Sequence, residues 1–139
     1  DGALIDMQGW IHIDDAGLMT EDGYIKVLGR MTNVISRGIT ITHPSLVEQM
    51  LMKCDSVSSA AVVGVPDERL GEEIAAFVIP KKKLTEDELV HFFNEQYQTD
   101  EGKGITPGYF FIVDEFPLNA NGKVDVNKLK SVAIEKISK

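Results

Sequence analysis

Lys123 is the side chain whose type and setting in this sequence best suit chemistry. It lies in the turn Pro117-Leu-Asn-Ala-Asn-Gly-Lys-Val-Asp125, which follows an apolar segment that we expect to be a buried strand. A tight turn at Gly122 would project the ammonium from a short, rigid loop. Lysine is a compact positive charge that suits the oxygen atoms of phosphates and carboxylates. A loop lysine that only faces water explains the same residue, so the turn alone leaves both interpretations open.

The other residues that could do chemistry favour plainer interpretations. The histidines His12, His43 and His91 lie far apart and lack the spacing of metal ligands, so we expect no metal site. Acidic runs at 67–68, 72–73 and 86–88 could in principle support acid–base catalysis, but solvated faces or helix caps explain them better. The lysines at 81–83 form too short a basic run to indicate nucleic-acid binding.

Composition and charge are those of an ordinary globular domain. The 139 residues are 43% hydrophobic and 26% charged, with a net charge of −8, which argues against disorder and against nucleic acid held by bulk charge. Residues 121–139 are locally basic, with five lysines against Asp125 and Glu135. No apolar run approaches the roughly 20 residues of a membrane helix. The single cysteine, Cys54, fits a reducing compartment, and the start at Asp1 without a signal peptide suggests a piece of a longer chain.

The first elements that must position these residues are a hairpin and a helix. Asp22-Gly23, placed between apolar segments, predicts a β-hairpin over residues 17–29. After Pro44, apolar residues recur at helical spacing, and this pattern predicts a helix of about three turns. Either Thr42 or His43 can serve as its N-cap.

Apolar runs predict the strands of a sheet. The runs at 60–65 and 74–79 are too short for helices and are bounded by Pro66 and Pro80, so we expect two buried strands at the centre of the sheet. The β-prone run at 109–113 predicts a further strand after a loop over residues 98–107.

Two more helices carry clear end signals. Thr85 and Glu88 form a capping box, so a helix should begin at Glu86 and bury Leu89, Phe92 or Phe93, and Tyr97. Asp125 is the expected N-cap of a C-terminal helix. The elements together predict an α+β fold, a small N-terminal β-hairpin followed by a short mixed β-sheet covered by about three helices. The expected apolar face of the last helix consists of Val126, Leu129, Val132, Ala133 and Ile137.

Five motifs occur in one order along the chain. They are Trp10-Ile-His-Ile-Asp-Asp15-Ala-Gly17, Gly23-Tyr-Ile-Lys-Val-Leu-Gly29-Arg30, Ser36-Arg37-Gly38 with Pro44 and Glu48, Ala61-Val-Val-Gly-Val-Pro-Asp-Glu-Arg-Leu-Gly71-Glu72, and Pro117 to Lys123. Together they resemble the C-terminal portion of the adenylate-forming superfamily, in its acyl-CoA synthetase, 4-coumarate–CoA ligase and luciferase-like branch. The resemblance covers nearly the whole chain.

The resemblance implies a domain of an ATP-dependent ligase. Such an enzyme joins a carboxylic acid, here a fatty or aryl acid, to ATP as an acyl-adenylate and passes the acyl group to coenzyme A. ATP with Mg²⁺ and coenzyme A would bind mainly with a large N-terminal domain absent from this chain. Residues 1–30 would be the end of that domain and the hairpin leading to the hinge, and residues 31–139 would be its mobile C-terminal lid. The isolated chain is then expected not to turn over substrate by itself.

The resemblance also assigns roles to individual residues. Lys123 matches the adenylation lysine, Asp15 the acid that binds the ribose hydroxyls, and Arg30 the arginine that contacts the same sugar. Without the resemblance, Asp15 would be explained as a turn cap and Arg30 as one member of a surface ion pair. Thr32 stands at the hinge position.

Three positions depart from the family pattern. Thr32 replaces the usual Asp or Lys of the hinge, and Leu46 replaces an acid, leaving Glu48. The loop of Arg37, Gly38 and Ile39 would border the channel for coenzyme A. That loop usually has a second glycine where Ile39 stands, and a branched residue adds bulk and resists positive φ. The departures leave the thioester step open.

Other functions remain open at this point. The adenylate could pass to oxygen or to a carrier thiol, as in luciferase-like or peptide-synthetase-like proteins, or the chain could come from a non-catalytic homologue. The expected partners are its own N-terminal domain and a carboxylic acid substrate, with no nucleic acid and no membrane span. The expected location is intracellular, cytoplasmic or peroxisomal. The C-terminal Ser138-Lys139 stops one residue short of a Ser-Lys-Leu peroxisomal signal, which either a truncated tail or chance explains.

Overall fold

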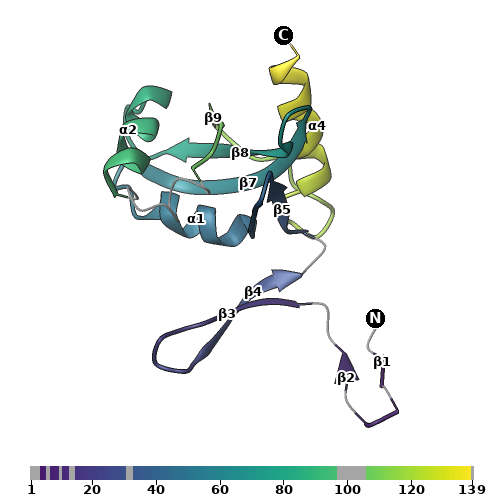
Figure 1. Cartoon of the computed structure of the whole chain (residues 1–139). Helices are drawn as coiled ribbons and strands as arrows, with labels where there is room; N and C mark the ends of the chain where they lie inside the picture. Colours follow the sequence, from purple (N-terminus) through teal and green to yellow (C-terminus); the bar gives the residue numbers. More distant parts are fainter. Residues whose placement is uncertain are drawn as a thin grey trace.

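Two β-hairpins precede a larger layered body (Figure 1). The computed structural model describes residues 4–5, 7–9, 11–12, 15–30, 33–96 and 106–138. Strands β1 (Leu4–Ile5) and β2 (Ile11–His12) pair antiparallel, as do β3 (Asp15–Met19) and β4 (Ile25–Arg30). The β3–β4 hairpin confirms the prediction from Asp22-Gly23, because Gly23 at the turn takes a φ of +87°.

A five-stranded mixed sheet forms the centre of the body. Its strands are β5 (Ile35–Arg37), β6 (Thr40–Thr42), β7 (Val57–Asp67), β8 (Gly71–Pro80) and β9 (Tyr109–Ile112). The order is β6-β5-β8-β7, and β9 pairs in parallel with β8 while the other pairs are antiparallel. Strand β8 therefore has paired strands on both sides and is the centre of the sheet.

The two predicted central strands are longer than the sequence indicated, and one of them is not central. Strand β7 is an edge strand in the sheet order, so the expectation that both runs lie at the centre was wrong for β7. Pro66 is not a boundary, since it pairs with Glu72 and β7 continues to Asp67, whereas Pro80 is the last residue of β8 and ends that strand as expected. An edge strand and a strand end tolerate a residue that lacks an N–H donor.

In the described part of the chain, three helices cover the two faces of the sheet. Helices α1 (Pro44–Met52) and α2 (Glu86–Gln96) share one core with one face of β7 and β8, and α4 (Val126–Ile137) packs on the opposite face (Figure 1). Neighbouring residues of β8 alternate between the cores, as Ile74 and Ala76 do against Ala75 and Phe77. Burial on both faces explains why these strands appear in the sequence as continuous apolar runs. The predicted α+β class is confirmed.

The helix ends follow the local signals. His43 is the N-cap of α1, and its side chain accepts a hydrogen bond from the N–H of Ser45. The capping box forms, because Thr85 Oγ1 accepts from the N–H of Glu88 at 3.2 Å and Glu88 Oε2 accepts from the N–H of Thr85 at 3.0 Å. Asp125 caps α4. These side chains satisfy backbone donors that the first turn of a helix leaves unpaired.

Two features were not predicted, and some predictions lie outside the described residues. The hairpins β1–β2 and β5–β6 were missed because their strands have only two or three residues each, too short for a periodic pattern. The hinge residue Thr32, the residue Tyr97 and most of the loop expected over 98–107 are outside the described ranges.

Candidate functional site

The turn that carries Lys123 is held by its own hydrogen bonds. Asn119 Oδ1 accepts from the N–H groups of Asn121 at 2.9 Å and Lys123 at 3.1 Å, and the N–H of Asn119 donates to the carbonyl of Lys123 at 2.7 Å. Gly122 takes a φ of +78°, as the turn requires. Leu118 and Val124 form an isolated antiparallel bridge at the base. The backbone on both sides of Lys123 is therefore fixed.

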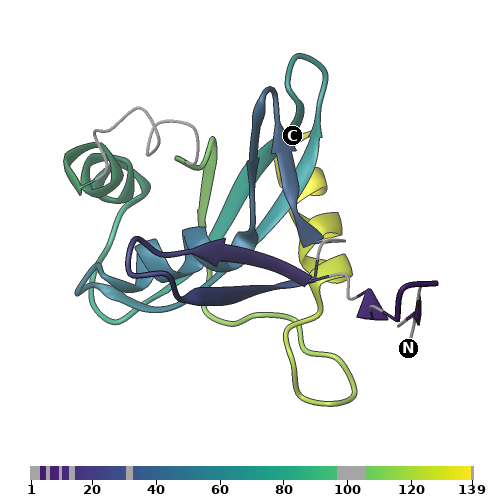
Figure 2. The same cartoon turned by 60° about the horizontal axis from the view of Figure 1, so that its bottom comes forward.

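The side chain of Lys123 is exposed, and the loop around it extends away from the sheet (Figure 2). Both views place this loop on the side of the molecule where β4 ends (Figures 1 and 2). An ammonium held out on a rigid turn can meet an anion presented by a neighbouring surface. The prediction that a short loop projects Lys123 is consistent with this geometry.

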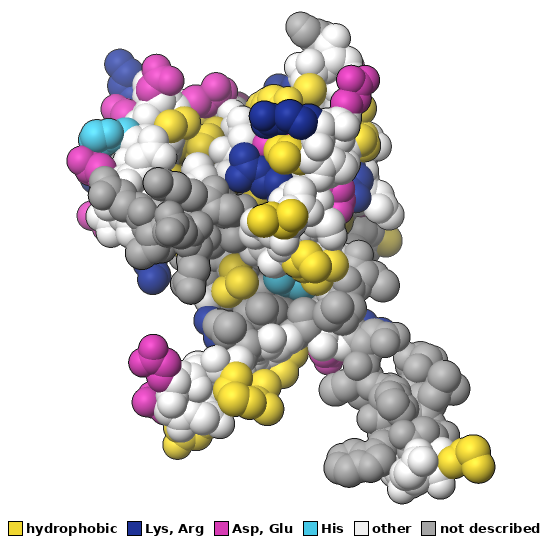
Figure 3. All heavy atoms as spheres, in the orientation of Figure 1, with side chains coloured by type: hydrophobic (Ala, Val, Ile, Leu, Met, Phe, Trp, Pro, Cys, Tyr) yellow, Lys and Arg dark blue, Asp and Glu magenta, His cyan; other side chains and the backbone are white. Residues whose placement is uncertain are grey.

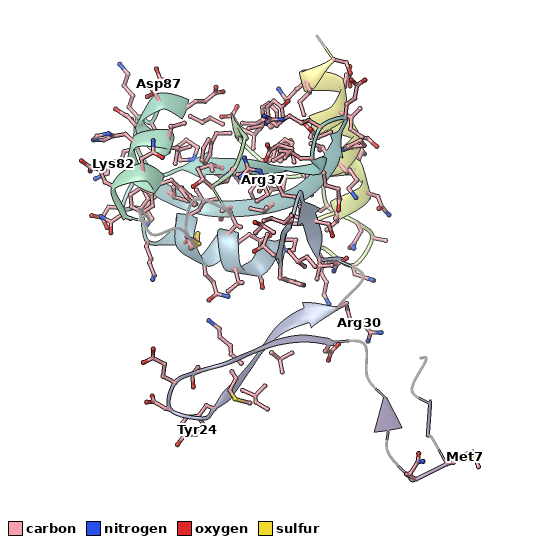
Figure 4. The ribbon with its side chains drawn as sticks, viewed as in Figure 1. Met7, Tyr24, Arg30, Arg37, Lys82 and Asp87 are labelled. Carbon is pink, nitrogen blue, oxygen red and sulfur yellow. The ribbon has the colours of Figure 1, made fainter. Side chains whose placement is uncertain are left out.

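The structure brings Asp15 and Arg30 together. They are cross-strand partners at the open end of the β3–β4 hairpin. Arg30 Nε lies 3.6 Å from Asp15 Oδ1, with 57% of the Arg30 side chain and 33% of the Asp15 side chain exposed. Figure 4 shows Arg30 at the end of β4. Both groups keep accessible hydrogen-bonding atoms, so the pair can present a carboxylate and a guanidinium to one polar ligand.

The β5–β6 hairpin contains the three residues expected to border the thiol channel. Gly38 takes a φ of +62°, and the next side chain, Ile39, is fully exposed at the tip. Gly38 and Ile39 line a hollow of about 290 Å³ together with Arg69 and Leu70. The glycine alone supplies the left-handed residue of this tip, so Ile39 avoids the conformation that a branched residue resists.

The Arg37 guanidinium contacts two groups outside the hairpin, and Arg37 also lines the hollow beside Gly38 and Ile39. Its Nε lies 2.7 Å from Oε1 of Glu73, and its Nη1 donates to the carbonyl of Thr106 at 3.1 Å. Glu73 is buried, with a residue exposure of 7%. The interpretation of residues 72–73 as a solvated acidic run was therefore wrong for Glu73, because a buried carboxylate needs a charged partner and Arg37 provides it.

Glu48, the acid that remains beside Leu46, supports the sheet rather than a ligand. Its Oε1 accepts from the N–H of Val62 at 3.0 Å. Burial raises the pKa of this carboxyl above its usual value, and the hydrogen bond from Val62 opposes that rise. Glu48 lines a cavity of about 440 Å³ between α1, β7 and the start of α4, together with His43, Glu72 and Lys130.

Three further features belong to the described part of the chain. No group of three or more His, Cys, Asp and Glu residues is arranged to hold a metal ion. No helix there is long and apolar enough to cross a membrane. Exposed apolar side chains gather on the β3–β4 hairpin (Figure 3); they belong to Met19, Tyr24, Ile25 and Val27, which are 65% to 74% exposed.

The chain is similar to a family of enzyme C-terminal domains and to CoA ligases of known sequence. The family described as AMP-binding enzyme C-terminal domain matches residues 46–123. A 3-[(3aS,4S,7aS)-7a-methyl-1,5-dioxo-octahydro-1H-inden-4-yl]propanoyl:CoA ligase of Rhodococcus jostii (strain RHA1) is 36% identical over 128 residues, which are 91% of this chain and 24% of that protein.

Two solved structures are similar over nearly the whole chain. o-Succinylbenzoate CoA synthetase from Bacillus subtilis, in complex with an acyl-adenylate intermediate, superposes with a TM-score of 0.74 at 28% identity over 91% of this chain and 25% of that one. The amide bond synthetase McbA from Marinactinospora thermotolerans superposes with a TM-score of 0.76 at 26% identity, over 93% of this chain and 26% of McbA. The chain thus spans about a quarter of the length of the proteins it matches.

Proposed function

The chain belongs to the family of AMP-binding enzyme C-terminal domains, and from this premise we propose that it is the mobile C-terminal lid of a carboxylate–CoA ligase. In the first half-reaction a carboxylate oxygen of the substrate acid attacks the α-phosphorus of ATP, and the bond to the β-phosphate oxygen breaks. The products are an acyl-adenylate and pyrophosphate. In the second half-reaction a thiolate attacks the acyl carbon, and AMP leaves.

The observation that carries this proposal is the exposed Lys123 on a turn fixed by Asn119. Negative charge accumulates on the carboxylate and the α-phosphate as they meet, and an ammonium whose side chain starts from a fixed backbone position lowers the energy of that arrangement more than one on a mobile loop can. Lys123 reaches such a site only where another part of the enzyme presents the anions, which fits a lid.

Asp15 and Arg30 are proposed to bind the nucleotide. Their cross-strand pairing and exposure support this, because the carboxylate can accept hydrogen bonds from ribose hydroxyls while the guanidinium donates to the same region. ATP is a substrate here, and its Mg²⁺ is assigned to the larger N-terminal part of the enzyme. We also infer an intracellular location, where ATP and coenzyme A are supplied.

Residues 1–30 are proposed to belong with the large N-terminal domain, and residues 31–139 to form the lid. The outward apolar face of the β3–β4 hairpin supports this division, since exposed apolar patches mark surfaces that other protein covers. Thr32 is proposed as the hinge, where any residue that absorbs a change in φ and ψ can serve.

The acceptor is proposed to be coenzyme A, with the loop of Arg37, Gly38 and Ile39 beside its channel. The names of the relatives support this, since several are CoA ligases. The similarity to an amide bond synthetase favours a second candidate, in which the adenylate passes to an acceptor other than coenzyme A. Either a fatty or an aryl acid is the proposed substrate class.

The experiment is Lys123→Ala in the full-length protein, with Lys82→Ala as the matched control. Lys82 is also an exposed lysine, and it lies near α2 (Figure 4). We expect the Lys123 variant to lose acid-dependent ATP–pyrophosphate exchange with an unchanged melting temperature, while the Lys82 variant keeps its exchange. Normal exchange in the Lys123 variant refutes the assigned role. Product analysis with and without coenzyme A then separates the two acceptors, and no AMP from a panel of acids indicates a non-catalytic homologue.

A further inference from the structure

Arg37 and Glu73 link three separate segments of the chain. Arg37 is the last residue of β5, and Glu73 lies on β8. Thr106 precedes β9, and its carbonyl accepts a hydrogen bond from Nη1 of Arg37. The ion pair has a 2.7 Å separation between Nε and Oε1, and the two side chains are only 22% and 9% exposed. A charge pair this far removed from water keeps its strength and its geometry better than a surface pair.

The surroundings of Glu73 restrict its position further. Its Oε1 also accepts from the N–H of Ile74 at 2.8 Å. A Cβ placed on Gly108 would overlap the carboxylate carbon of Glu73, so the backbone at 108 packs directly against this side chain. The N–H of Gly108 donates to the carbonyl of Ile74 at 3.0 Å. Glu73 is thus enclosed by backbone and by Arg37.

The β5–β6 hairpin has few other connections to the sheet near its tip. One pair of residues, Arg37 and Gly71, joins β5 to β8 in the ladder. The N–H of Gly38 donates to the carbonyl of Leu70 at 2.8 Å, and the N–H of Ser36 donates to Glu72 Oε1 at 3.0 Å. The Arg37–Glu73 pair therefore does much to fix the direction in which the tip of the β5–β6 hairpin points.

We propose that Glu73 is a positioning residue for the second half-reaction. Through Arg37 it fixes how the β5–β6 hairpin presents Gly38 and Ile39 to the acceptor thiol. The inference rests on the proposed function and adds to it a residue that makes no contact with substrate. It also gives Arg37 a supporting role in the thiol channel, since its guanidinium is engaged by Glu73 and Thr106.

The test compares the two half-reactions in the full-length enzyme. Glu73→Gln keeps the shape and removes the charge, and Arg37→Lys keeps the charge and removes the planar fork. We expect KM for coenzyme A to rise by about tenfold to a hundredfold in each variant, as misplacement of a positioning loop does. Acid-dependent pyrophosphate exchange should stay within about twofold of wild type, since the pair does not touch the adenylating lysine.

The double variant and a control distinguish positioning from a loss of stability. If the two residues act as one unit, Arg37→Lys with Glu73→Gln raises KM for coenzyme A no further than the larger single effect. Glu48→Gln is the matched control, a neutralised acid elsewhere in the fold that also accepts a backbone N–H, and its KM for coenzyme A should not change. If Glu73→Gln does not fold, Glu73→Asp, which keeps the charge and shortens the side chain that reaches Arg37, supplies the comparison.

The outcomes are distinct. A selective rise in KM for coenzyme A supports the inference. Equal losses in both half-reactions, multiplicative effects in the double variant, or no change in either single variant overturn it while leaving the proposed function intact. A wild-type enzyme that shows no pyrophosphate exchange with any acid contradicts the proposed function itself, and this inference with it.

Discussion

The imidazole of His43 connects the last residue of β4 to the first turn of α1. Its Nδ1 accepts from the N–H of Ser45 at 3.2 Å, and its Nε2 lies 3.3 Å from the carbonyl oxygen of Arg30. Gly29 makes room for the ring, because a Cβ there would lie 2.7 Å from Cε1 of His43. One side chain therefore caps a helix and holds the strand that ends in a proposed nucleotide-binding residue.

Replacing His43 separates these two roles. We expect His43→Ala to lower the free energy of unfolding by about 1 to 2 kcal/mol, through loss of the N-cap and of packing in a buried position. His43→Ser restores a capping oxygen without reaching Arg30, so its loss should be smaller. Urea unfolding of both variants measures the difference, and equal losses in the two would show that the cap contributes little.

Asn119 is expected to matter for adenylation although it need not touch the substrate. Asn119→Ala removes the acceptor for the N–H groups of Asn121 and Lys123, so the backbone that carries the Lys123 side chain is held less firmly. We expect pyrophosphate exchange in the full-length enzyme to fall by about tenfold, with little change in melting temperature because the turn is exposed. Asn119→Asp keeps an accepting oxygen and should retain most of the exchange. If the Ala variant matches wild type, the turn does not position Lys123.

The close approach of Gly108 to Glu73 predicts a non-additive pair of substitutions. Gly108→Ala forces a Cβ into the Glu73 carboxylate and should destabilise the fold by about 1 to 3 kcal/mol. Glu73→Ala opens that space but leaves Arg37 without its carboxylate, and so is itself destabilising. Adding Gly108→Ala to Glu73→Ala should then cost little more. Chemical unfolding of the two single variants and the double gives the coupling, and full additivity would contradict the packing.

The raised pKa of Glu48 predicts a pH dependence of stability. A carboxyl whose pKa is higher in the folded than in the unfolded state binds more protons when folded, so its contribution to stability is present below the unfolded pKa of about 4.5. That contribution is lost as pH rises through the folded pKa. The glutamine of Glu48→Gln can still accept from Val62 and carries no charge. The free energy of unfolding of Glu48→Gln, relative to that of wild type, should therefore increase as pH rises through this window. Urea unfolding from pH 4 to 7 measures this difference. If the two proteins show the same dependence of stability on pH, Glu48 is not desolvated.

The sequence by itself determined the parts of this protein that depend on near neighbours. The Asp22-Gly23 turn, the capping box of Thr85 and Glu88, and the cap at Asp125 all form as predicted, because each uses hydrogen bonds or backbone angles within a few residues. The turn around Lys123 is likewise held by hydrogen bonds between residues that are close in the sequence. The Asp15–Arg30 pairing follows from the hairpin once its register is known.

Only the tertiary structure decided the environment of residues whose partners are distant in the chain. Glu73 meets Arg37 from 36 positions earlier and the backbone at Gly108, so its burial could not be distinguished from a solvated acidic run. Pro66 lies inside a strand because β7 is at an edge, which depends on the order of the whole sheet. Local patterns specify elements and their ends, whereas the burial of a charge depends on which surfaces the assembled sheet brings together.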